Sequence, residues 1–326
     1  MVPQPSFYKK GELMLLHEIL GIKYPIIQGA MAHIATPEFA ATVSNTGALG
    51  IVATGTMDAA RAEEAILKCK SLTDKPFGVN LMLMNPHCDA IVEIIIKHKP
   101  VIVTTGAGNP GPYIPRLKEA GIKVVPIVPT VSLARRLEQV GADMIIVEGT
   151  ESGGHVGEMT TLTLVPQAVD ALKIPVIAAG GIADGRTMAA VLNLGAIGVQ
   201  VGTVLLTAHE CPCHDNYKQA VINAKDSDTV VTGRSVGAPV RILKNQMSTE
   251  YIKREKLGTT RDELEHLTLG SLRRAVFEGD MKTGSLMMGQ IAGMMKTLRP
   301  IQQIFDDMIR ETKEQAKRFK EIDDAL

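Results

Sequence analysis

The sequence contains no tryptophan, and aromatic residues make up only 3% of the chain. Its 35 lysine and arginine residues are balanced by 35 aspartate and glutamate residues, so the formal net charge is zero. Nucleic-acid binding normally needs a basic surface and aromatic side chains on which bases stack. Because the sequence has neither feature, it predicts no nucleic-acid partner.

Cysteine is also scarce, with four residues in 326 at irregular spacing. This excludes the disulfide framework typical of small secreted domains. The N-terminus lacks the basic segment, apolar segment and small-residue cleavage site of a secretory signal. No apolar run approaches the roughly 18 residues that a membrane-spanning helix requires. We therefore expect a cytoplasmic protein that does not bind membranes.

What the sequence does contain is an apolar fraction of 45% and a repeated pattern of short apolar runs. A helix-length segment follows each run. Strands of a parallel sheet are buried on both faces and lack alternation of polar and apolar residues. The pattern predicts an α/β fold, a (β/α)8 TIM barrel, with an open doubly wound sheet as the competing architecture. The eight runs are residues 24–28, 48–53, 77–82, 101–106, 123–128, 144–149, 175–180 and 197–202.

Several of the intervening helices have recognisable start signals. Thr36 precedes a proline that suits the first helical position, and Asp58, Thr130 and Asp184 precede segments with helical apolar spacing. Hydroxyl and carboxylate side chains at these positions can accept hydrogen bonds from the first free N–H groups of a helix. The sequence therefore predicts helices that begin directly after these four residues.

The barrel pattern stops after the eighth strand. Residues 211–299 contain 14 lysines and arginines against 10 aspartates and glutamates, a net charge of +4. We expect them to form a smaller α/β cap domain that helps to bind substrate. The barrel then comprises residues 14–210 and 300–326, whose last segment has helical apolar spacing and is expected to pack back on the barrel. Residues 1–13 are interpreted as an extension.

Functional groups in TIM barrels lie on the loops that follow the strands. Here the first such loop is rich in small residues, and the loops after strands seven and eight contain glycines that allow a phosphate to approach backbone N–H groups. Strand three ends near an amide and strand six near a carboxylate. Candidate ligand-binding residues on these loops are Gly29, Ala30, Met31, Asn80, Glu148, Gly180, Gly181, Gln200, Gly202 and Thr203.

One histidine, His155, lies in the glycine-rich segment ESGGHVG that follows strand six. An imidazole has an unperturbed pKa of about 6.5, so it can exchange a proton near neutral pH. A packing or capping histidine is the alternative interpretation. The position at the barrel mouth favours a catalytic role.

Three other motifs are ambiguous. Residues 106–111 match G-x-G-x-x-G, but Pro110 and Pro112 remove N–H donors, so we interpret this segment as a barrel loop near substrate or NAD(P)H. The segment HECPCH at 209–214 lacks the usual C-x2-C spacing of a metal site, and a helix start is the preferred interpretation, with no metal expected. Met281, Met287, Met288, Met294 and Met295 either line an acyl channel or fill the core.

These residues together resemble the FMN-dependent family that contains enoyl-acyl carrier protein reductase II (FabK) and the nitronate monooxygenases. The matching segments are GIKYPIIQGAMA, VSNTGALGIV, FGVNLM, EGTESGGHVG, IPVIAAGGIADG, GVQVGT and SLMMGQIAGMM, in order from residue 21 to 295. One departure is His33, where related reductases often have an aromatic residue.

The resemblance implies that FMN lies across the barrel mouth. Its ring is expected near Gly29, Ala30, Met31 and Asn80, with Glu148 and Gly153 alongside. Its phosphate is expected on Gly180, Gly181, Gln200, Val201, Gly202 and Thr203. His155 matches the active-site histidine of the family, and Gly289 and Gln290 are expected to help close the pocket.

The resemblance also implies the reaction. We expect an FMN-dependent enoyl-[acyl carrier protein] reductase of type II fatty-acid synthesis, with NAD(P)H as hydride donor and an acyl carrier protein thioester as substrate. The alternatives are a nitronate monooxygenase and a noncatalytic flavin- or phosphate-binding barrel. The loop ESGGH, in place of EAGGH, and Glu148, in place of glutamine, favour the reductase. Basic residues of the cap are candidates for steering an acidic carrier protein: Arg241, Lys244, Lys253, Arg254, Lys256, Arg273 and Arg274. A homodimer is left open.

Overall fold

The computed structural model describes residues 8–9 and 12–325. Eight parallel strands follow one another in the order β3-β11-β10-β8-β7-β6-β5-β4. A parallel bridge between Ile27 and Leu49 joins the two end strands and closes the ring. This confirms the predicted (β/α)8 barrel. The strands are β3 (Ile26–Gln28), β4 (Gly50–Ala53), β5 (Phe77–Met82), β6 (Ile102–Gly106), β7 (Lys123–Val128), β8 (Ile145–Glu148), β10 (Val176–Ala179) and β11 (Val199–Val201).

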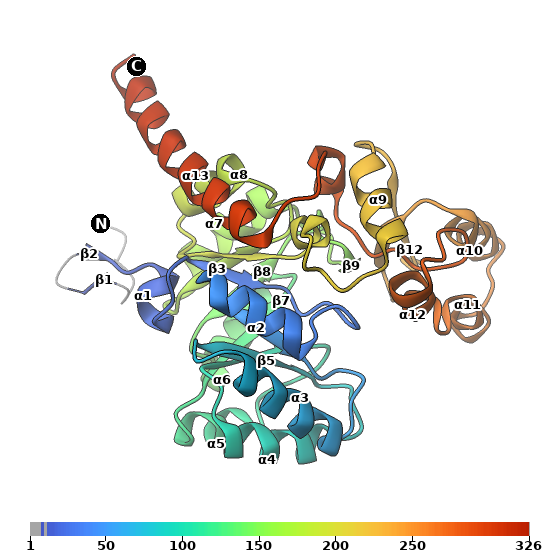
Figure 1. Cartoon of the computed structure of the whole chain (residues 1–326), viewed down its shortest axis with the longest axis horizontal. Helices are drawn as coiled ribbons and strands as arrows, with labels where there is room; N and C mark the ends of the chain where they lie inside the picture. Colours follow the sequence, from blue (N-terminus) through green and yellow to red (C-terminus); the bar gives the residue numbers. More distant parts are fainter. Residues whose placement is uncertain (1–7, 10–11, 326) are drawn as a thin grey trace.

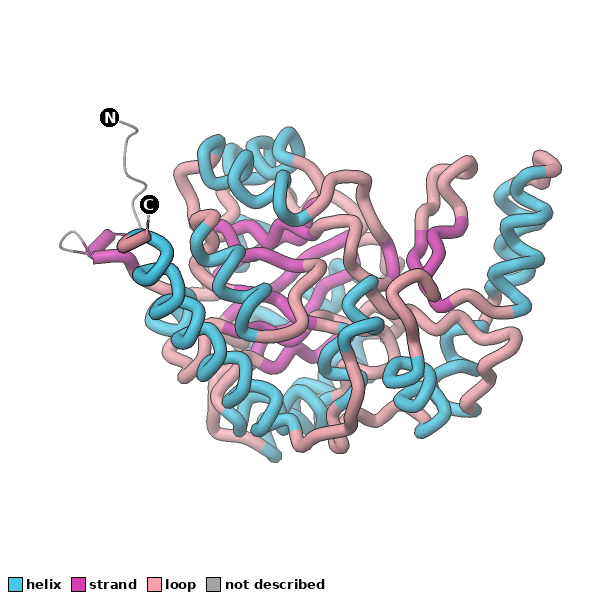
Figure 2. Tube along the Cα trace, turned by 90° about the horizontal axis from the view of Figure 1, so that it is seen from above, coloured by secondary structure: helices cyan, strands magenta, loops and turns pink. Residues whose placement is uncertain are grey.

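Helices surround this ring of strands, as Figures 1 and 2 show. Seven of them each follow a strand. The C-terminal helix α13 packs between α8 and α2 and so takes the eighth position, although the whole insert separates it from β11. The helices are α2 (Pro37–Thr46), α3 (Ala59–Leu72), α4 (Cys88–His98), α5 (Ile114–Glu119), α6 (Val131–Val140), α7 (Thr161–Ala171), α8 (Gly185–Asn193) and α13 (Ile301–Asp323).

The four predicted helix starts are confirmed. The Thr36 hydroxyl accepts a hydrogen bond from the Phe39 N–H at 3.2 Å, and Pro37 opens the helix. Asp58, Thr130 and Asp184 accept in the same way from the third residue of their helices. Each cap satisfies an N–H group that has no partner within the helix.

Apolar side chains from the strands and from a short helix, α1 (Leu16–Leu20), form one of the buried clusters. The Leu16 N–H donates to the Ile197 carbonyl at 2.8 Å, which fixes α1 close to the start of β11. A β-hairpin of β1 (Tyr8–Lys9) and β2 (Glu12–Leu13) precedes it. Most of the expected extension 1–13 lies outside the described residues.

The insert after β11 adds a second, three-stranded sheet beside the barrel (Figure 2). Its central strand β13 pairs antiparallel with β12 and with β9 (Gly154–His155), which belongs to the barrel loop after β8. The insert therefore holds the histidine loop directly. The short helix η1 (Thr203–Thr207) lies between β11 and the insert. The elements of the insert are α9 (Asp215–Asn223), β12 (Thr229–Thr232), β13 (Val240–Leu243), α10 (Gln246–Lys256), α11 (Arg261–Thr268), α12 (Ser271–Arg273), the π-helix η2 (Arg274–Glu278) and η3 (Gln290–Met294).

Within residues 8–9 and 12–325, no helix combines the length and apolar character that crossing a membrane requires.

Candidate active site

A cavity of about 540 Å³ opens at the carboxyl end of the barrel strands and extends beneath the insert. This volume lies in the usual range for small-molecule and cofactor sites. Nearly all of the sequence-predicted site residues line it, from six different segments of the chain. They are Gly29, Ala30, Met31, Asn80, Glu148, Gly153, His155, Gly180, Gly181, Gln200, Val201, Gly202, Thr203 and Gly289.

Gln290 is the predicted site residue that does not line this cavity. Gln290 is exposed, whereas its neighbours Gly289 and Ile291 line the cavity wall. Its backbone N–H donates to the Glu151 carbonyl at 2.9 Å. In this structure Gln290 therefore closes the pocket through its backbone and not through its side-chain amide.

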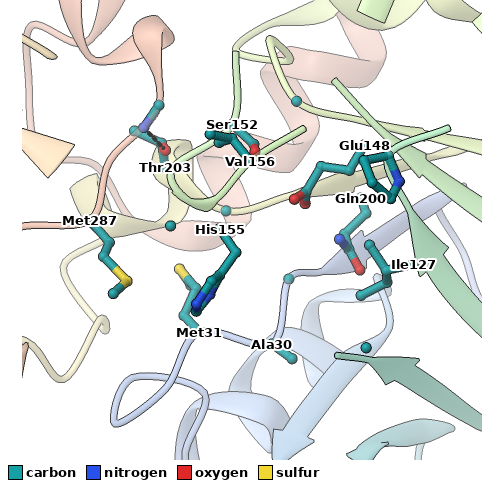
Figure 3. A pocket seen from close by; sticks show the side chains of 18 of the residues that line it. Ala30, Met31, Ile127, Glu148, Ser152, His155, Val156, Gln200, Thr203 and Met287 are labelled. Carbon is teal, nitrogen blue, oxygen red and sulfur yellow. Dashed lines mark hydrogen bonds between the residues drawn. The ribbon is translucent and has the colours of Figure 1, made fainter. Parts of the chain in front are cut away.

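His155 is held at the cavity by the insert. It lies on β9 opposite Val240 of β13, and the next residue, Val156, donates its N–H to the Pro239 carbonyl at 3.2 Å. Figure 3 shows the imidazole pointing into the cavity beside Met31. Part of the ring surface is accessible through the open cavity, but the surrounding protein removes water and lowers the pKa of His155 below its ordinary value of 6.5. The ring is therefore mostly neutral at pH 7.

Arg241 supports the same loop from the other side. It lies opposite Gly154 in the β13–β9 pair, and its side chain is buried. Its Nε donates to the Thr150 carbonyl at 3.1 Å and its Nη1 to the Thr229 hydroxyl at 3.0 Å. The guanidinium thus fastens the start of the histidine loop to the insert.

Glu148 ends strand β8, and its side chain enters the cavity (Figure 3). Burial raises the pKa of its carboxyl to about 7, and no neighbouring cation opposes the rise. The nearby Ser152 hydroxyl lowers the pKa and offsets only part of this rise. A carboxyl whose pKa is raised to about 7 and an imidazole whose pKa is lowered by burial thus share one cavity.

The loops after β10 and β11 form a concave backbone surface. Gly180 and Gly181 have φ angles of 85° and 74°, which strongly favour glycine. A Cβ atom on Gly180 would lie 2.7 Å from the Gly149 carbonyl oxygen. Within the described residues, the N–H groups of Gly181 and Thr203 donate to no protein acceptor. Free N–H groups on glycine loops are suited to bind an anionic group such as a phosphate.

Unpaired polar atoms also face this region. In the described chain, the buried Oε1 of Gln200 and Oγ of Ser152 have no hydrogen-bond partner. The side-chain amide nitrogen of Asn80 donates to the Thr104 hydroxyl at 3.1 Å, which leaves the side-chain oxygen Oδ1 available. Buried polar groups normally have a partner, so these atoms indicate a polar ligand.

A segment of the insert closes the cavity by backbone contacts. The Gly289 N–H donates to the Thr203 hydroxyl at 2.8 Å, and the Tyr217 hydroxyl donates to the Met287 carbonyl at 2.8 Å. Met287 lines the cavity, whereas Met288 and Met295 belong to the core. The methionine run therefore contributes to the cavity wall at one position and to the core at others.

His33 joins the barrel to the insert at the rim. Its φ angle is 64°, uncommon for a residue other than glycine, and its ring meets the Phe277 ring edge-on at 5.6 Å. Arg273 lies over the same phenyl ring at 5.6 Å. The position where related reductases often have an aromatic residue thus still makes a ring contact.

The remaining motifs are not separate sites. Gly106 and Ala107 of the G-x-G-x-x-G segment line the cavity as part of a barrel loop, as interpreted from its prolines. His214 precedes α9, and its Nδ1 accepts a hydrogen bond from the Asn216 N–H at 3.0 Å, which confirms a helix start. Cys211 and Cys213 are buried free thiols.

Motif reasoning missed several lining residues because the patterns around them do not show which side chains face the cavity. Glu151 accepts hydrogen bonds from the N–H and hydroxyl of Thr161 at the start of α7, so its carboxylate is already engaged. Others come from strands and from the insert and are brought to the cavity only by folding. They include Met82, Ile127, Pro129, Leu206, Pro239, Leu272 and Ile291.

Comparisons with known proteins agree with this architecture. The structure of FabK from Thermotoga maritima superposes with a TM-score of 0.92 at 44% identity, covering 95% of this chain and 100% of FabK. A probable nitronate monooxygenase of Staphylococcus saprophyticus is 35% identical over 325 residues, 83% of this chain and 90% of that protein.

A third relative is the (3aS,4S,5R,7aS)-5-hydroxy-7a-methyl-1-oxo-octahydro-1H-indene-4-carboxyl-CoA dehydrogenase of Rhodococcus jostii, 37% identical over 232 residues. That match covers 71% of this chain but only 66% of the relative. The family model described as nitronate monooxygenase matches residues 14–91 and 87–311, which is most of the chain. The chain therefore belongs to the nitronate monooxygenase family, and it is an oxidoreductase of this family.

Proposed function

We propose that the protein is an FMN-dependent enoyl-thioester reductase that takes hydride from NAD(P)H and acts in type II fatty-acid synthesis. The observation that carries this proposal is the placement of His155 and Glu148 in one cavity with the glycine loops after β10 and β11. Full-length similarity to FabK at 44% identity supports the same reaction.

The residues present fit an FMN cofactor. The N–H groups of Gly181 and Thr203 are free to bind its phosphate, and the unpaired oxygens of Gln200 and Ser152 can accept hydrogen bonds from the cofactor. Because Gly29 has no side chain, a ligand in the cavity can approach the barrel backbone at this position. Bound FMN would supply hydride transfer, a step that amino-acid side chains do not perform.

His155 is proposed to orient the thioester. Hydride addition to the β-carbon of an enoyl thioester produces an enolate, which needs a hydrogen bond at oxygen and a proton at the α-carbon. A neutral imidazole can donate its N–H to the enolate oxygen, and the lowered pKa of His155 favours this form. Glu148, with a pKa of about 7, can hold a proton inside the cavity at neutral pH.

The substrate is proposed to be a trans-2-enoyl group on an acyl carrier protein. The dehydrogenase relative acts, by its name, on a coenzyme A thioester, which supports a thioester substrate. The apolar wall formed by Leu206, Leu272 and Met287 suits an acyl chain.

Nitronate monooxygenase is the second candidate function. The 35% identity to the probable nitronate monooxygenase of Staphylococcus saprophyticus and the family match favour it. A histidine at the position of His155 can equally well orient a nitronate or remove a proton from its precursor.

One experiment separates the two reactions. The purified protein, reconstituted with FMN, is given NAD(P)H with crotonyl-pantetheine, or a propyl nitronate with oxygen. We expect NAD(P)H consumption and a saturated thioester product. Oxygen consumption with the nitronate in the absence of NAD(P)H would favour the second candidate, and a protein that does not take up FMN would overturn both.

A further inference from the structure

The seven basic residues of the insert that are candidates for steering a carrier protein differ in how they are placed. Arg241 is buried beneath the histidine loop and cannot meet a partner. Three others are paired with acidic neighbours and contribute little free charge: Arg254 with Glu250, Arg273 with Glu278, and Arg274 with Asp280. Lys244, Lys253 and Lys256 remain.

These three lysines line one depression of about 400 Å³ on the insert, which we call the lysine groove. Thr249, Ile252, Lys253 and Lys256 recur at the spacing of a single helix face on α10. Val230 of β12 and Ile252 supply apolar surface in the groove. A small apolar surface edged by ammonium groups is a common form of protein docking site.

The positive charge of the groove is only partly offset by nearby acidic groups, of which Glu250 is close enough to interact with Lys253. In the described part of the chain, Lys253 and Lys256 form no ion pair or hydrogen bond through their side chains, and both residues are exposed. Lys244 donates to the Ser227 carbonyl, which leaves its charge in place. α10 contains two acidic residues: Glu250 is paired with Arg254, and the Glu255 carboxylate accepts hydrogen bonds from the Gly233 N–H and from Ser235.

The groove is connected to the active site by the small sheet. β12 contributes Val230 to the groove and pairs with β13, which pairs with the His155 strand β9. Neighbouring strands are about 4.8 Å apart, so β12 lies on the order of 10 Å from β9. A partner in the groove would therefore be close to the strand that carries His155.

We propose that the lysine groove is the docking surface for an acidic acyl carrier protein. This inference rests on the proposed function, because it names the partner that presents the thioester. Acidic helices of the carrier would pair with Lys244, Lys253 and Lys256, while Val230 and Ile252 contact its apolar residues. Such rim charges mainly change the association rate and its salt dependence.

Lysines beside an exposed strand edge have a second common role, which is to prevent edge-to-edge aggregation. Charge reversal separates the two roles, because glutamate also protects an edge but repels an acidic partner. The test variant is Lys253→Glu/Lys256→Glu. The matched control is Lys68→Glu/Lys317→Glu, which reverses two exposed lysines on the barrel helices α3 and α13.

Turnover is compared with crotonyl-acyl carrier protein and with crotonyl-pantetheine, which lacks both protein and phosphate. Binding of the acyl carrier protein alone is measured by fluorescence anisotropy, which does not depend on catalysis. We expect the groove variant to raise KM for the carrier thioester and Kd for the carrier roughly tenfold at low ionic strength. Its kcat/KM for crotonyl-pantetheine and its melting temperature should match those of the control, and the difference should shrink as salt is added.

An unchanged Kd for the carrier would overturn the docking proposal. An equal loss of kcat/KM with the carrier thioester and with crotonyl-pantetheine would also overturn it. Failure of the wild type to reduce either thioester would instead overturn the proposed reaction, while the anisotropy result would still decide the docking proposal. Lys253→Gln/Lys256→Gln provides a second variant, for which we expect a smaller rise in KM for the carrier thioester and in Kd for the carrier.

Discussion

Gly153 and Gly289, far apart in the sequence, pack backbone to backbone at the cavity wall. A Cβ atom on Gly153 would lie 2.6 Å from the carbonyl carbon of Met288, and one on Gly289 would lie 2.5 Å from the Glu151 carbonyl oxygen. Both distances are too short for a real side chain. Gly153, two residues before His155, therefore admits the closing segment of the insert, in addition to lining the cavity.

The first prediction concerns this contact. Gly153→Ala should displace the closing segment and destabilise the flavin-free protein by about 1–3 kcal/mol, the usual cost of overpacking. Urea denaturation measures the change. Gly106→Ala is the matched control, because a Cβ there meets nothing within 4 Å and its φ angle is ordinary. Equal stability of the two variants would show that the segment is not held by this packing.

The second prediction concerns the hydrogen bond from the Gly289 N–H to the Thr203 hydroxyl, which is buried. Thr203→Val keeps the shape but leaves the N–H without an acceptor, at a cost of about 1–3 kcal/mol. Thr203→Ser keeps the hydroxyl and should retain most of the stability. FMN should also dissociate faster from the valine variant, as measured by flavin fluorescence. If valine and serine variants behaved alike, the hydrogen bond would have no role in closing the cavity.

The third prediction concerns His155. His155→Ala should fold and retain FMN but lose turnover by about a hundredfold or more, because the group that orients the thioester is gone. Stopped-flow absorbance should still show reduction of the flavin by NAD(P)H. His266→Ala, an exposed position on α11, should have wild-type activity. Full activity in His155→Ala would contradict the role assigned to the imidazole.

The fourth prediction concerns the pH dependence of stability. The folded protein raises the pKa of Glu148 from 4.5 to about 7, so in that window the folded state binds more protons than the unfolded state and loses stability as pH rises. Glu148→Gln removes this loss. Its stability relative to the wild type should therefore increase between pH 5 and pH 8, by about 1–2 kcal/mol once solvent in the open cavity is considered.

Denaturation of the flavin-free proteins at both pH values measures this effect. Glu64→Gln, on the exposed face of α3, is the control and should show no such increase. If the difference in stability between Glu148→Gln and the wild type were the same at pH 5 and pH 8, the folded protein would not raise the pKa of this carboxyl.

The barrel was predictable because its signals are local. Each strand is a short apolar run, and each helix start that was predicted depends on one capping side chain within three residues, as at Thr36 and Asp184. The carboxyl ends of all eight parallel strands meet at one end of the ring. Residues following different strands, such as Asn80 and Gly181, could therefore be assigned to one cavity from their order alone.

The insert was not predictable in this way because its contacts join distant segments. One strand of its sheet, β9, belongs to a barrel loop. The eighth helical position of the barrel is filled by α13, which follows the insert in the sequence. No local pattern indicates that the side chain of Gln290 lies outside the cavity, or which basic residues of the insert are buried or paired.

The sequence by itself thus determined the ring of strands, its loops and the residues at its mouth, because these depend on short-range periodicity and on the geometry of parallel strands. The tertiary structure decided which side chains face the cavity, how far the pKa of Glu148 rises, why Gly153 must be glycine and where positive charge remains free. These properties depend on which groups surround each side chain, and a side chain becomes buried or paired only when the chain folds.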